Sequence, residues 1–328
     1  MAKAWCLKTR PTGMPTASNF ELVELPHVPL ADGEIRVANA WLSVDPYMRG
    51  RMNDVKSYAE PFQIGKPMQG GAVGVVTESR ASGIAVGDKV QHMLGWRDET
   101  VLPAADAHKL PDTALPIQTF LHNLGLTGAT AYFGLTHTAS AKAGDIVFVS
   151  AAAGAVGSAV VQIAKAKGMT VIGSAGGADK CAWVMDLGAD ACIDYKSGPV
   201  LPQLMAAAPK GIDVYFDNVG GEHLDAAYAT ARLHARFAIC GMIDVYNHGE
   251  PMVFKYFIRT IPARIQSTGF LFTDFLPQMG AFMAEVGPLV ANGKLKARET
   301  VFEGLESAPD AFLGLFSGAN TGKMLVKI

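Results

Sequence analysis

The sequence predicts an α/β protein of two domains, in which a β-rich domain precedes a doubly wound parallel sheet. Three observations lead to this prediction. The chain has 328 residues, which exceeds the usual size of one domain. Residues 1–120 contain short Val-, Ile- and Gly-rich strand signals at close spacing, a pattern typical of a partly open β-barrel or a sandwich. From about residue 120 strand and helix signals alternate, which indicates βαβ units with helices on both faces of the sheet.

The individual elements follow from apolar runs and from the glycines that interrupt them. In the first domain, strand signals include residues 35–37, 72–76 and 87–90. In the second domain, we expect strands at 146–150, 170–174, 191–194, 212–217, 235–240 and 265–272, and helices at 156–167, 178–187, 200–207, 222–231 and 274–292. Gly168 and Gly188 stand where the first two of these helices should end, because glycine readily adopts the left-handed conformation found there. The tail at 324–328 returns to strand character.

The composition argues against several classes of function. Charged residues make up only 18% of the chain and the formal net charge is −2, so there is no electrostatic case for a nucleic acid or an anionic membrane as partner. The four cysteines form no CxxC pair, which argues against a disulfide scaffold or a structural zinc and favours a cytoplasmic location. The longest apolar stretch, residues 146–164, is broken by serines and glycines, and the N-terminus carries no long apolar run. We therefore expect neither a membrane span nor a signal peptide.

The segment from Asp145 to Gly168 carries the strongest functional signal. A buried strand leads into the turn AAAGAVG, residues 151–157, and an apolar helix follows. Gly154 allows the backbone to approach a pyrophosphate, Gly157 allows the helix to pack closely on the strand, and the helix N-terminus favours an anion. Such a turn can also serve packing alone, but the alternating strands and helices after it favour a dinucleotide site.

The end of the next strand distinguishes NAD from NADP. An NAD site typically has an acidic side chain at this strand end, which accepts hydrogen bonds from the ribose hydroxyls. Here the chain reads Val171-Ile172-Gly173-Ser174-Ala175-Gly176-Gly177, with no acid. Lys180 follows one helical turn later, where an ammonium can meet a 2′-phosphate, and Asp179 is expected to cap the helix. Lys180 alone could be an ordinary solvated residue, but together with the missing acid it predicts NADP(H) as the cofactor.

Seven stretches of the chain resemble one group of enzymes. They are LSVDPYMRGRM (42–52), GKPMQGGAVGVV (65–76), LGLTGATAYFGL (124–135), VFVSAAAGAVGS (147–158), DVYFDNVGG (213–221), TGF (268–270) and GANTGKMLVKI (318–328). Together they resemble the medium-chain dehydrogenase/reductase superfamily over essentially the whole chain. DPYMRGRM and DNVGG resemble its zinc-independent branch of leukotriene/prostaglandin reductases and alkenal/one double-bond reductases. The resemblance implies a GroES-like, partly open β-barrel catalytic domain at residues 1–121, a Rossmann NADP-binding domain at 122–294, and a C-terminal segment, 295–328, that returns to the catalytic domain.

The residues that zinc-dependent members of the superfamily use for the metal are missing. The places where those enzymes carry a cysteine and a Gly-His-Glu stretch read Ser43-Val44-Asp45 and Gln69-Gly70-Gly71. Neither place offers a thiolate or an imidazole, which are the usual zinc ligands. We therefore expect no metal.

The resemblance also implies which residues contact the cofactor. The pyrophosphate turn matches Ala153, Gly154, Ala155 and Val156, and the 2′-phosphate site matches Gly176, Lys180 and Tyr195. Asn218 matches the asparagine of DNVGG, Cys240 and Gly241 end a strand at the carboxyl edge of the sheet, and the surroundings of the nicotinamide match Thr130, Phe270, Leu271, Phe272 and Asn320. Turn formation is an alternative role for both asparagines, because each lies two residues before a glycine.

The implied reaction is NADPH-dependent reduction of the C=C bond of α,β-unsaturated ketones and aldehydes. Hydride addition to the β carbon moves charge onto the carbonyl oxygen, which hydrogen-bond donors can stabilise without a metal. Many members of the branch carry a tyrosine seven residues before the glycine of the GF motif, but this residue is Pro262 here. Tyr47 is our first candidate for the donor and Tyr256 the second, although Tyr47 could equally be a core aromatic residue, and a cofactor ribose hydroxyl could donate instead.

Two other functions stay open on the sequence alone. A zinc-free NADPH quinone oxidoreductase would share the same cofactor site. A cofactor-binding protein without catalysis would be consistent with the loss of the tyrosine at Pro262. The resemblance further implies a homodimer formed through the cofactor domains and a small-molecule substrate.

Overall fold

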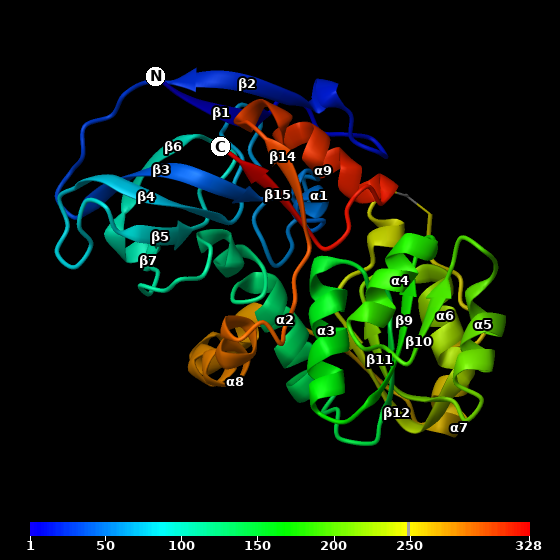
Figure 1. Ribbon diagram of the computed structural model, residues 1–328. Coiled ribbons are helices and arrows are strands. Elements are labelled where there is room, and N and C mark those ends of the chain that lie inside the picture. The colour runs from blue at the N-terminus through cyan, green and yellow to red at the C-terminus, as the bar shows by residue number, and fades with distance from the viewer. Residues whose placement is uncertain (248–249) are drawn as a thin grey trace. The chain divides into compact units, whose positions relative to one another are not determined.

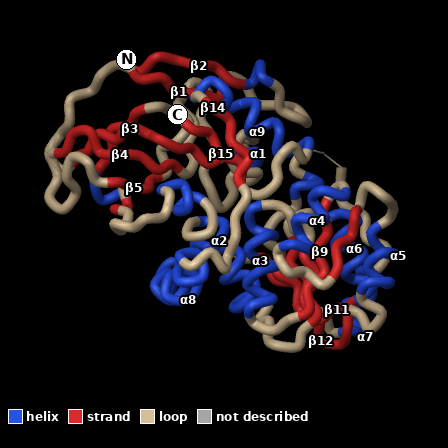
Figure 2. The backbone as a smooth tube through the Cα atoms, viewed as in Figure 1, coloured by secondary structure: helices blue, strands red, loops and turns tan. Residues whose placement is uncertain are grey.

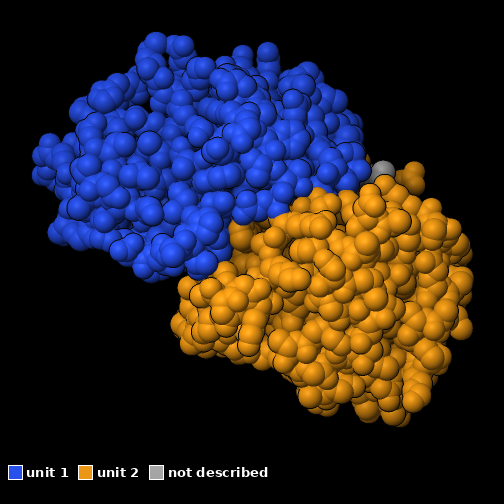
Figure 3. All heavy atoms as spheres, in the orientation of Figure 1, with its two compact units in different colours: residues 1–121, 299–320, 324–328 blue, residues 122–298, 321–323 orange. Residues whose placement is uncertain are grey.

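The computed structural model describes residues 1–247 and 250–328 and divides the chain into two units (Figures 1 and 3). Unit 1 comprises Met1–Leu121, Glu299–Asn320 and Met324–Ile328, and unit 2 comprises His122–Arg298 and Thr321–Lys323. The chain therefore leaves unit 2 after Arg298, later than the predicted boundary at 294. Three residues of the tail also belong to unit 2, and the prediction had assigned them to the first domain.

Unit 1 is built on a sheet of seven strands with the order β14-β15-β3-β4-β5-β7, in which β6 also pairs with β3, and on a separate pair β1-β2. The strands are β1 (Ala2–Leu7), β2 (Phe20–Leu25), β3 (Glu34–Ser43), β4 (Ala72–Ser79), β5 (Lys89–His92), β6 (Glu99–Pro103), β7 (His108–Lys109), β14 (Glu299–Glu303) and β15 (Lys323–Lys327), and the helices are α1 (Met48–Arg51) and α9 (Ala308–Ser317). The rings of Phe20, Trp96 and Phe312 pack together with centroids 5.9–6.1 Å apart. The tail joins this unit because β15 pairs antiparallel with β3.

Unit 2 contains a parallel sheet of six strands with the order β10-β9-β8-β11-β12-β13. The strands are β8 (Ile146–Val149), β9 (Thr170–Ala175), β10 (Ala191–Asp194), β11 (Ile212–Asp217), β12 (Ala231–Ile239) and β13 (Gln266–Gly269), and the helices are α2 (Leu126–Phe133), α3 (Ala155–Ala166), α4 (Ala178–Asp186), α5 (Val200–Ala207), α6 (Gly221–Thr230), α7 (Thr260–Ala263) and α8 (Met279–Ala291). Helices lie on both sides of the strands (Figure 2). Residues of α5 and α6 form one core with Phe148, Ile172 and Tyr215 of the sheet.

The strand order of unit 2 reverses between β8 and β11. From β8 the chain proceeds outward to β9 and β10, and it then returns to the other side of β8 with β11, β12 and β13. Val149 and Phe216 are register partners close to the carboxyl ends of β8 and β11. Ligands of open α/β sheets bind outside the carboxyl ends of the strands at such a switch point.

Most predicted elements of unit 2 are confirmed. The strands at 191–194 and 212–217 and the helix at 200–207 have the predicted bounds. Gly168 and Gly188 have φ angles of 78° and 96° just beyond α3 and α4, as expected for glycines that end helices. The predicted α/β class is confirmed as well, with one sheet-rich unit and one parallel-sheet unit. In the part of the chain that the structure describes, no helix is long and apolar enough to cross a membrane.

Three predicted elements need correction. β12 starts at Ala231 and not at 235, since the chain passes from α6 into the strand without a loop. β13 covers only 266–269 of the predicted 265–272. The predicted helix at 274–292 is a 3₁₀ helix over Phe272–Gln278 followed by α8, because Pro277 lacks the N–H group that an α-helix needs at this point.

Candidate functional site

The turn after β8 opens helix α3 and leaves little room for side chains. Gly154 is the N-cap residue of α3. A Cβ atom on Gly157 would lie 2.3 Å from the Ala151 carbonyl oxygen, so glycine is required and the helix packs closely on the turn. A Cβ atom on Gly154 would lie 3.2 Å from the same oxygen, which is a milder conflict. Because the first N–H groups of an α-helix have no partner within the helix, those of Ala155 and Val156 are suited to hold a phosphate.

Part of the C-terminal tail lies against this turn. The Gly322 N–H donates to the Ala153 carbonyl at 2.7 Å, and Gly322 forms an isolated β-bridge with Gly154. Gly322 has a φ angle of 73°, and a Cβ atom there would lie 2.0 Å from the Arg298 carbonyl oxygen. Only glycine fits this position, which anchors the chain two residues after Asn320.

Residues after β9 and β10 bring two lysines together. We call Gly176, Lys180, Tyr195 and Lys196 the basic corner. A Cβ atom on Gly176 would lie 2.5 Å from the Tyr195 hydroxyl oxygen and 3.1 Å from Lys196 Cε, so glycine is required here as well. Burial, and secondly the Lys196 ammonium, lower the pKa of Lys180. Two neighbouring positive charges favour the binding of an anion, which would relieve their repulsion.

Asp194 holds the backbone of the basic corner in place. Its Oδ1 atom accepts hydrogen bonds from the N–H groups of Gly177 and Lys196, at 2.8 and 2.9 Å. Lys196 was not among the predicted site residues, because the charge argument considered only the end of β9, and the resemblance matched only its neighbour Tyr195 after β10. Parallel pairing of β9 and β10 places the two strand ends side by side.

The predicted role of Asp179 as a helix cap is wrong. The N-cap residue of α4 is Gly177, with a φ angle of 101° and no side-chain cap. Asp179 lies two positions further on, inside the first turn, whereas a capping side chain must come from the residue before the helix. A carboxylate in the first turn still interacts favourably with the helix dipole.

Asn218 ties the loop after β11 to the turn after β8. Its Nδ2 atom donates to the Ser150 carbonyl at 2.8 Å, and its backbone N–H donates to Ser150 Oγ at 2.9 Å. The side-chain nitrogen is thus engaged within the protein at the switch point. Both predicted roles, turn formation and ligand contact, are compatible with this placement, because the side-chain oxygen is a separate acceptor.

Asp217 is a buried carboxylate that the sequence reasoning missed. Its Oδ1 atom accepts hydrogen bonds from the Tyr215 hydroxyl at 2.7 Å and from the N–H groups of Val219 and Gly220 at 2.9 and 2.8 Å. Burial raises the pKa of Asp217, and these bonds act in the opposite direction. An acid that ends a buried strand and precedes Asn-Val-Gly-Gly is the signal that could have found it.

The loops after β11 and β12 are joined at the same edge. The N–H groups of Cys240 and Gly241 both donate to the Asp217 carbonyl, at 2.9 and 3.0 Å. Burial, together with the Asp217 carboxylate, raises the pKa of the Cys240 thiol to about 12. The thiol therefore stays protonated near neutral pH and is unsuited to act as a nucleophile.

The segment after β13 packs against α2, which carries Thr130. A Cβ atom on Gly134 would lie 2.3 Å from Phe270 Cζ and 2.6 Å from Phe216 Cε2, and the two phenyl rings are 6.0 Å apart. Thr130, one helical turn before Gly134, is 8% exposed. The structure thus gathers most of the predicted cofactor residues at the carboxyl edge of the unit 2 sheet: Thr130, Ala153 to Val156, Gly176, Lys180, Tyr195, Asn218, Cys240, Gly241 and Phe270 to Phe272.

Tyr47 lies in unit 1, directly before helix α1. Its ring packs on the core that contains Met48 and Phe312, and its hydroxyl oxygen is buried without a hydrogen-bond partner among the described residues. Burial is the main cause that raises the pKa of this hydroxyl, and the nearby Arg51 guanidinium opposes the effect. The phenol is therefore protonated at neutral pH and able to donate a hydrogen bond.

Tyr256 lies beside α6, and Pro262 lies away from this carboxyl edge. The Tyr256 N–H donates to Asp225 of α6 at 2.9 Å, and its side chain is 37% exposed. Three residues later, Arg259 reaches the carbonyl of Ala231, the first residue of β12. Pro262 is an exposed residue of α7, which precedes β13. A side chain at position 262 therefore stands at the opposite end of β13 from Phe270.

The places that hold a metal in zinc-dependent relatives are engaged otherwise. The Ser43 hydroxyl donates to the Asp45 carboxylate, and Gln69 accepts a hydrogen bond from Arg51 at 2.8 Å. Among residues 1–247 and 250–328, no three His, Cys, Asp or Glu side chains are grouped so that they could hold a metal ion.

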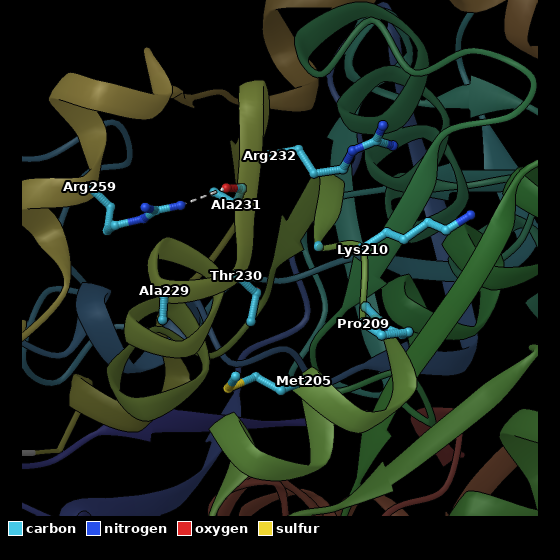
Figure 4. Close-up of a pocket in the computed structure, with 10 residues that line it drawn as sticks. Met205, Pro209, Lys210, Ala229, Thr230, Ala231, Arg232 and Arg259 are labelled. Atoms are coloured by element: carbon cyan, nitrogen blue, oxygen red, sulfur yellow. Dashed lines mark hydrogen bonds between the residues drawn. The ribbon is translucent and has the colours of Figure 1, made fainter.

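A pocket of about 280 Å³ lies at the other edge of the unit 2 sheet (Figure 4). Gly211 and Ala231 line it, at the amino ends of β11 and β12. Lys210 and Arg232 extend away from Arg259, so the three cations do not converge (Figure 4). None of the predicted site residues lines this pocket.

Two family models match the chain. Residues 3–110 match the N-terminal domain of oxidoreductase, and residues 155–285 match the zinc-binding dehydrogenase model. The NADPH-dependent curcumin reductase of Escherichia coli is 38% identical over 99% of this chain and 96% of its own length. The NADP(+)-dependent 2-alkenal reductase of Nicotiana tabacum is 39% identical over 98% and 96%, and prostaglandin reductase 1 of Bos taurus is 40% identical over 99% of both chains.

A solved structure is similarly close. The crystal structure of CurA from Vibrio vulnificus in complex with NADPH matches with a TM-score of 0.94 and 40% identity, over 99% of this chain and 98% of that chain. The similarity therefore extends over both units and is not limited to the parallel sheet.

Proposed function

Because this chain belongs to the medium-chain dehydrogenase/reductase superfamily, in its zinc-independent branch of prostaglandin and alkenal/one reductases, we propose that it reduces the C=C bond of α,β-unsaturated ketones and aldehydes with NADPH. One observation carries this proposal. The match to reductases whose names specify curcumin, 2-alkenals and prostaglandins covers at least 98% of the chain. The residues of the carboxyl edge described above support it.

The residues of unit 2 fit NADPH. The turn at Ala153 to Val156, at the start of α3, would hold the pyrophosphate, and the basic corner would hold the 2′-phosphate. Within the basic corner, Lys180 and Lys196 supply charge and Tyr195 a hydroxyl. Thr130, Asn218, Cys240, Gly241, Phe270 to Phe272 and Asn320 would surround the nicotinamide. NADPH, when bound, supplies the hydride.

Tyr47 is our candidate for the hydrogen-bond donor to the substrate oxygen. Its hydroxyl is buried and lacks a partner among the described residues, and buried polar groups are normally paired. A carbonyl oxygen that gains negative charge during hydride addition would supply the missing acceptor. Tyr256 is the second candidate, and its exposure counts against it.

The reaction is tested by following NADPH oxidation with a panel of enones, alkenals and quinones, and by analysing the products. We expect turnover of enones and alkenals to saturated products whose carbonyl group is intact. An allylic alcohol product would contradict the proposal. Much faster turnover of quinones would favour a quinone oxidoreductase, and NADPH binding without turnover would favour a non-catalytic cofactor-binding protein.

We also propose that the protein is a cytoplasmic homodimer formed through unit 2. β13 is an edge strand whose four residues are all exposed, and the nearby Phe257, Ile258 and Ile261 are 56%, 68% and 74% exposed. An open edge next to exposed apolar side chains is suited to pair with a second copy. Four free cysteines suit a reducing compartment. Sedimentation should give twice the chain mass of 34.6 kDa, and a monomer at micromolar concentration would contradict the dimer.

A further inference from the structure

Two cysteines meet next to the basic corner. Cys181 lies in α4, directly after Lys180, and Cys192 lies in β10, three residues before Tyr195. Both side chains are half-buried. Cys192 pairs with Gly173, where a Cβ atom would lie 2.5 Å from Val184 of α4, so Cys192 faces the helix that carries Cys181. The Cys181 thiol also donates to the carbonyl of Ala175, the last residue of β9, at 3.9 Å. The thiol pair therefore sits between the strand end and the helix start that form the corner.

We propose that Cys181 and Cys192 form a redox modification site, in which a hydroperoxide converts the two thiols to a disulfide that weakens the binding of NADPH. The effect on NADPH rests on the proposed function, because it requires the basic corner to hold the 2′-phosphate. The formation of the disulfide does not depend on that function.

The chemistry requires two thiols and one hydroperoxide. The Cys181 sulfur attacks the hydroperoxide, so that an S–O bond forms, the O–O bond breaks, and water or an alcohol leaves with the thiol proton. The Cys192 sulfur then attacks the Cys181 sulfenic acid, so that the S–S bond forms, the S–O bond breaks, and the hydroxyl leaves as water with the Cys192 proton. Both sulfurs are oxidised by one electron each and the peroxide is reduced by two.

The surroundings assign the order of the two steps. Burial, and secondly the neighbouring Cys181 thiol, raise the pKa of Cys192, so that this thiol stays protonated. A protonated thiol reacts poorly with peroxide, which suits Cys192 to the second step. The other cysteines are placed differently, since Cys6 belongs to unit 1 and Cys240 lies beside Asp217.

A disulfide would change the dimensions of the basic corner. The two sulfurs of a disulfide are about 2.05 Å apart, closer than two sulfur atoms that are not bonded to each other, so α4 and β10 must approach each other. Lys180 and Tyr195 move with these elements. Gly176 and the Tyr195 hydroxyl are already so close that no Cβ atom fits between them. A further approach of α4 and β10 would therefore reduce the space in which the basic corner could hold a phosphate.

The first test asks whether the bond forms. Trypsin should release both cysteines in one peptide, residues 181–196, because no lysine or arginine lies between them. After treatment of the full-length protein with hydrogen peroxide, this peptide should lose two hydrogen atoms in mass, and dithiothreitol should restore them. Cys181→Ser and Cys192→Ser should each abolish the loss, and Cys6→Ala should keep it. Oxidation that yields only sulfinic or sulfonic acid, or a bond between other cysteines, would overturn the proposal.

The second test asks whether the bond acts on the corner. The dissociation constants of NADPH and NADH are measured by nicotinamide fluorescence, which needs no turnover and thus separates this proposal from the proposed reaction. Oxidation should weaken NADPH binding at least several-fold and leave NADH binding nearly unchanged, and Cys181→Ser should remove the effect. Equal changes for both nucleotides, or no change in a fully oxidised sample, would overturn the link to the basic corner.

Discussion

The Lys196 ammonium contributes to lowering the pKa of Lys180, which shows that two positive charges share the basic corner. A hydrogen bond to a charged group contributes about 1.5–3 kcal/mol. Lys180→Ala and Lys196→Ala should therefore each raise the KM for NADPH by roughly ten- to a hundredfold and leave the KM for NADH nearly unchanged. Steady-state kinetics with both nucleotides checks this. Lys210→Ala, on the opposite edge of the sheet, serves as the control and should change neither value.

If Lys180→Ala raises the KM for NADPH and the KM for NADH equally, Lys180 does not contact the 2′-phosphate. If Lys180→Ala raises the KM for NADPH and Lys196→Ala does not, Lys196 does not contact the 2′-phosphate. The site would then contain only the lysine that the sequence predicted.

Tyr47 allows catalysis and stability to be separated at one residue. In Tyr47→Phe the ring still packs on the unit 1 core, while the buried and unpaired hydroxyl is lost. Removal of an oxyanion donor typically costs about 10²–10³-fold in rate, so kcat should fall by roughly a hundredfold. The melting temperature should stay equal or rise, because folding of the variant no longer removes the Tyr47 hydroxyl from water without giving it a hydrogen-bond partner.

Unchanged kcat in Tyr47→Phe would rule out this tyrosine as the donor. If kcat falls more in Tyr256→Phe than in Tyr47→Phe, Tyr256 is the hydrogen-bond donor.

At the scale of elements, the contact between α3 and the turn after β8 depends on a missing side chain. Gly157→Ala would place a Cβ atom 2.3 Å from the Ala151 carbonyl oxygen, so helix and turn must separate. Overpacking of this kind costs about 1–3 kcal/mol, and we expect a lower melting temperature and weaker NADPH binding. Gly287→Ala in α8, where a Cβ atom meets nothing within 4 Å, is the matched control. It should stabilise the protein by up to about 1 kcal/mol through helix propensity. Similar effects of both substitutions would contradict the steric argument.

The packing of α6 on β9 includes a histidine that should make stability depend on pH. His223 is 6% exposed, its Nε2 atom lies 2.8 Å from Ser174 Oγ, and burial lowers its pKa to about 4. In the unfolded chain a histidine titrates near pH 6.5, so the unfolded state binds the proton first as the pH falls. The contribution of neutral, buried His223 to the free energy of unfolding is therefore fully present above about pH 6.5, and it is lost as the pH falls towards 4. Melting temperatures of the wild type and His223→Gln should converge between pH 7 and pH 5, and parallel curves would contradict this.

At the scale of the whole molecule, the sequence was most informative where local pattern alone decides the structure. The strand at 212–217 and the helix at 200–207 have the predicted bounds, since a buried apolar run and the turn residues around it are local signals. Asp217 was missed although an acid at the end of a buried strand is a local signal, whereas Lys196 was missed because its role depends on a neighbour from another strand. Only the parallel pairing of β9 with β10 brings the strand end before Lys196 next to the strand end before Lys180.

The same reasoning applies to the correction at Asp179. The sequence offers an acid near the start of a helix, which is a good local signal for a cap. In the structure the N–H group of the N-cap residue, Gly177, donates to Asp194, the last residue of β10. Site residues that depend on such tertiary neighbours cannot be read from spacing along the chain.

The central claim is that hydride is added to the β carbon of an enone. The most direct measurement uses NADPH deuterated at C4 of the nicotinamide with a simple enone, and locates the deuterium in the product by NMR. We predict one deuterium at the β carbon of a saturated ketone and none at the carbonyl carbon. Deuterium on the carbonyl carbon of an allylic alcohol would contradict the account.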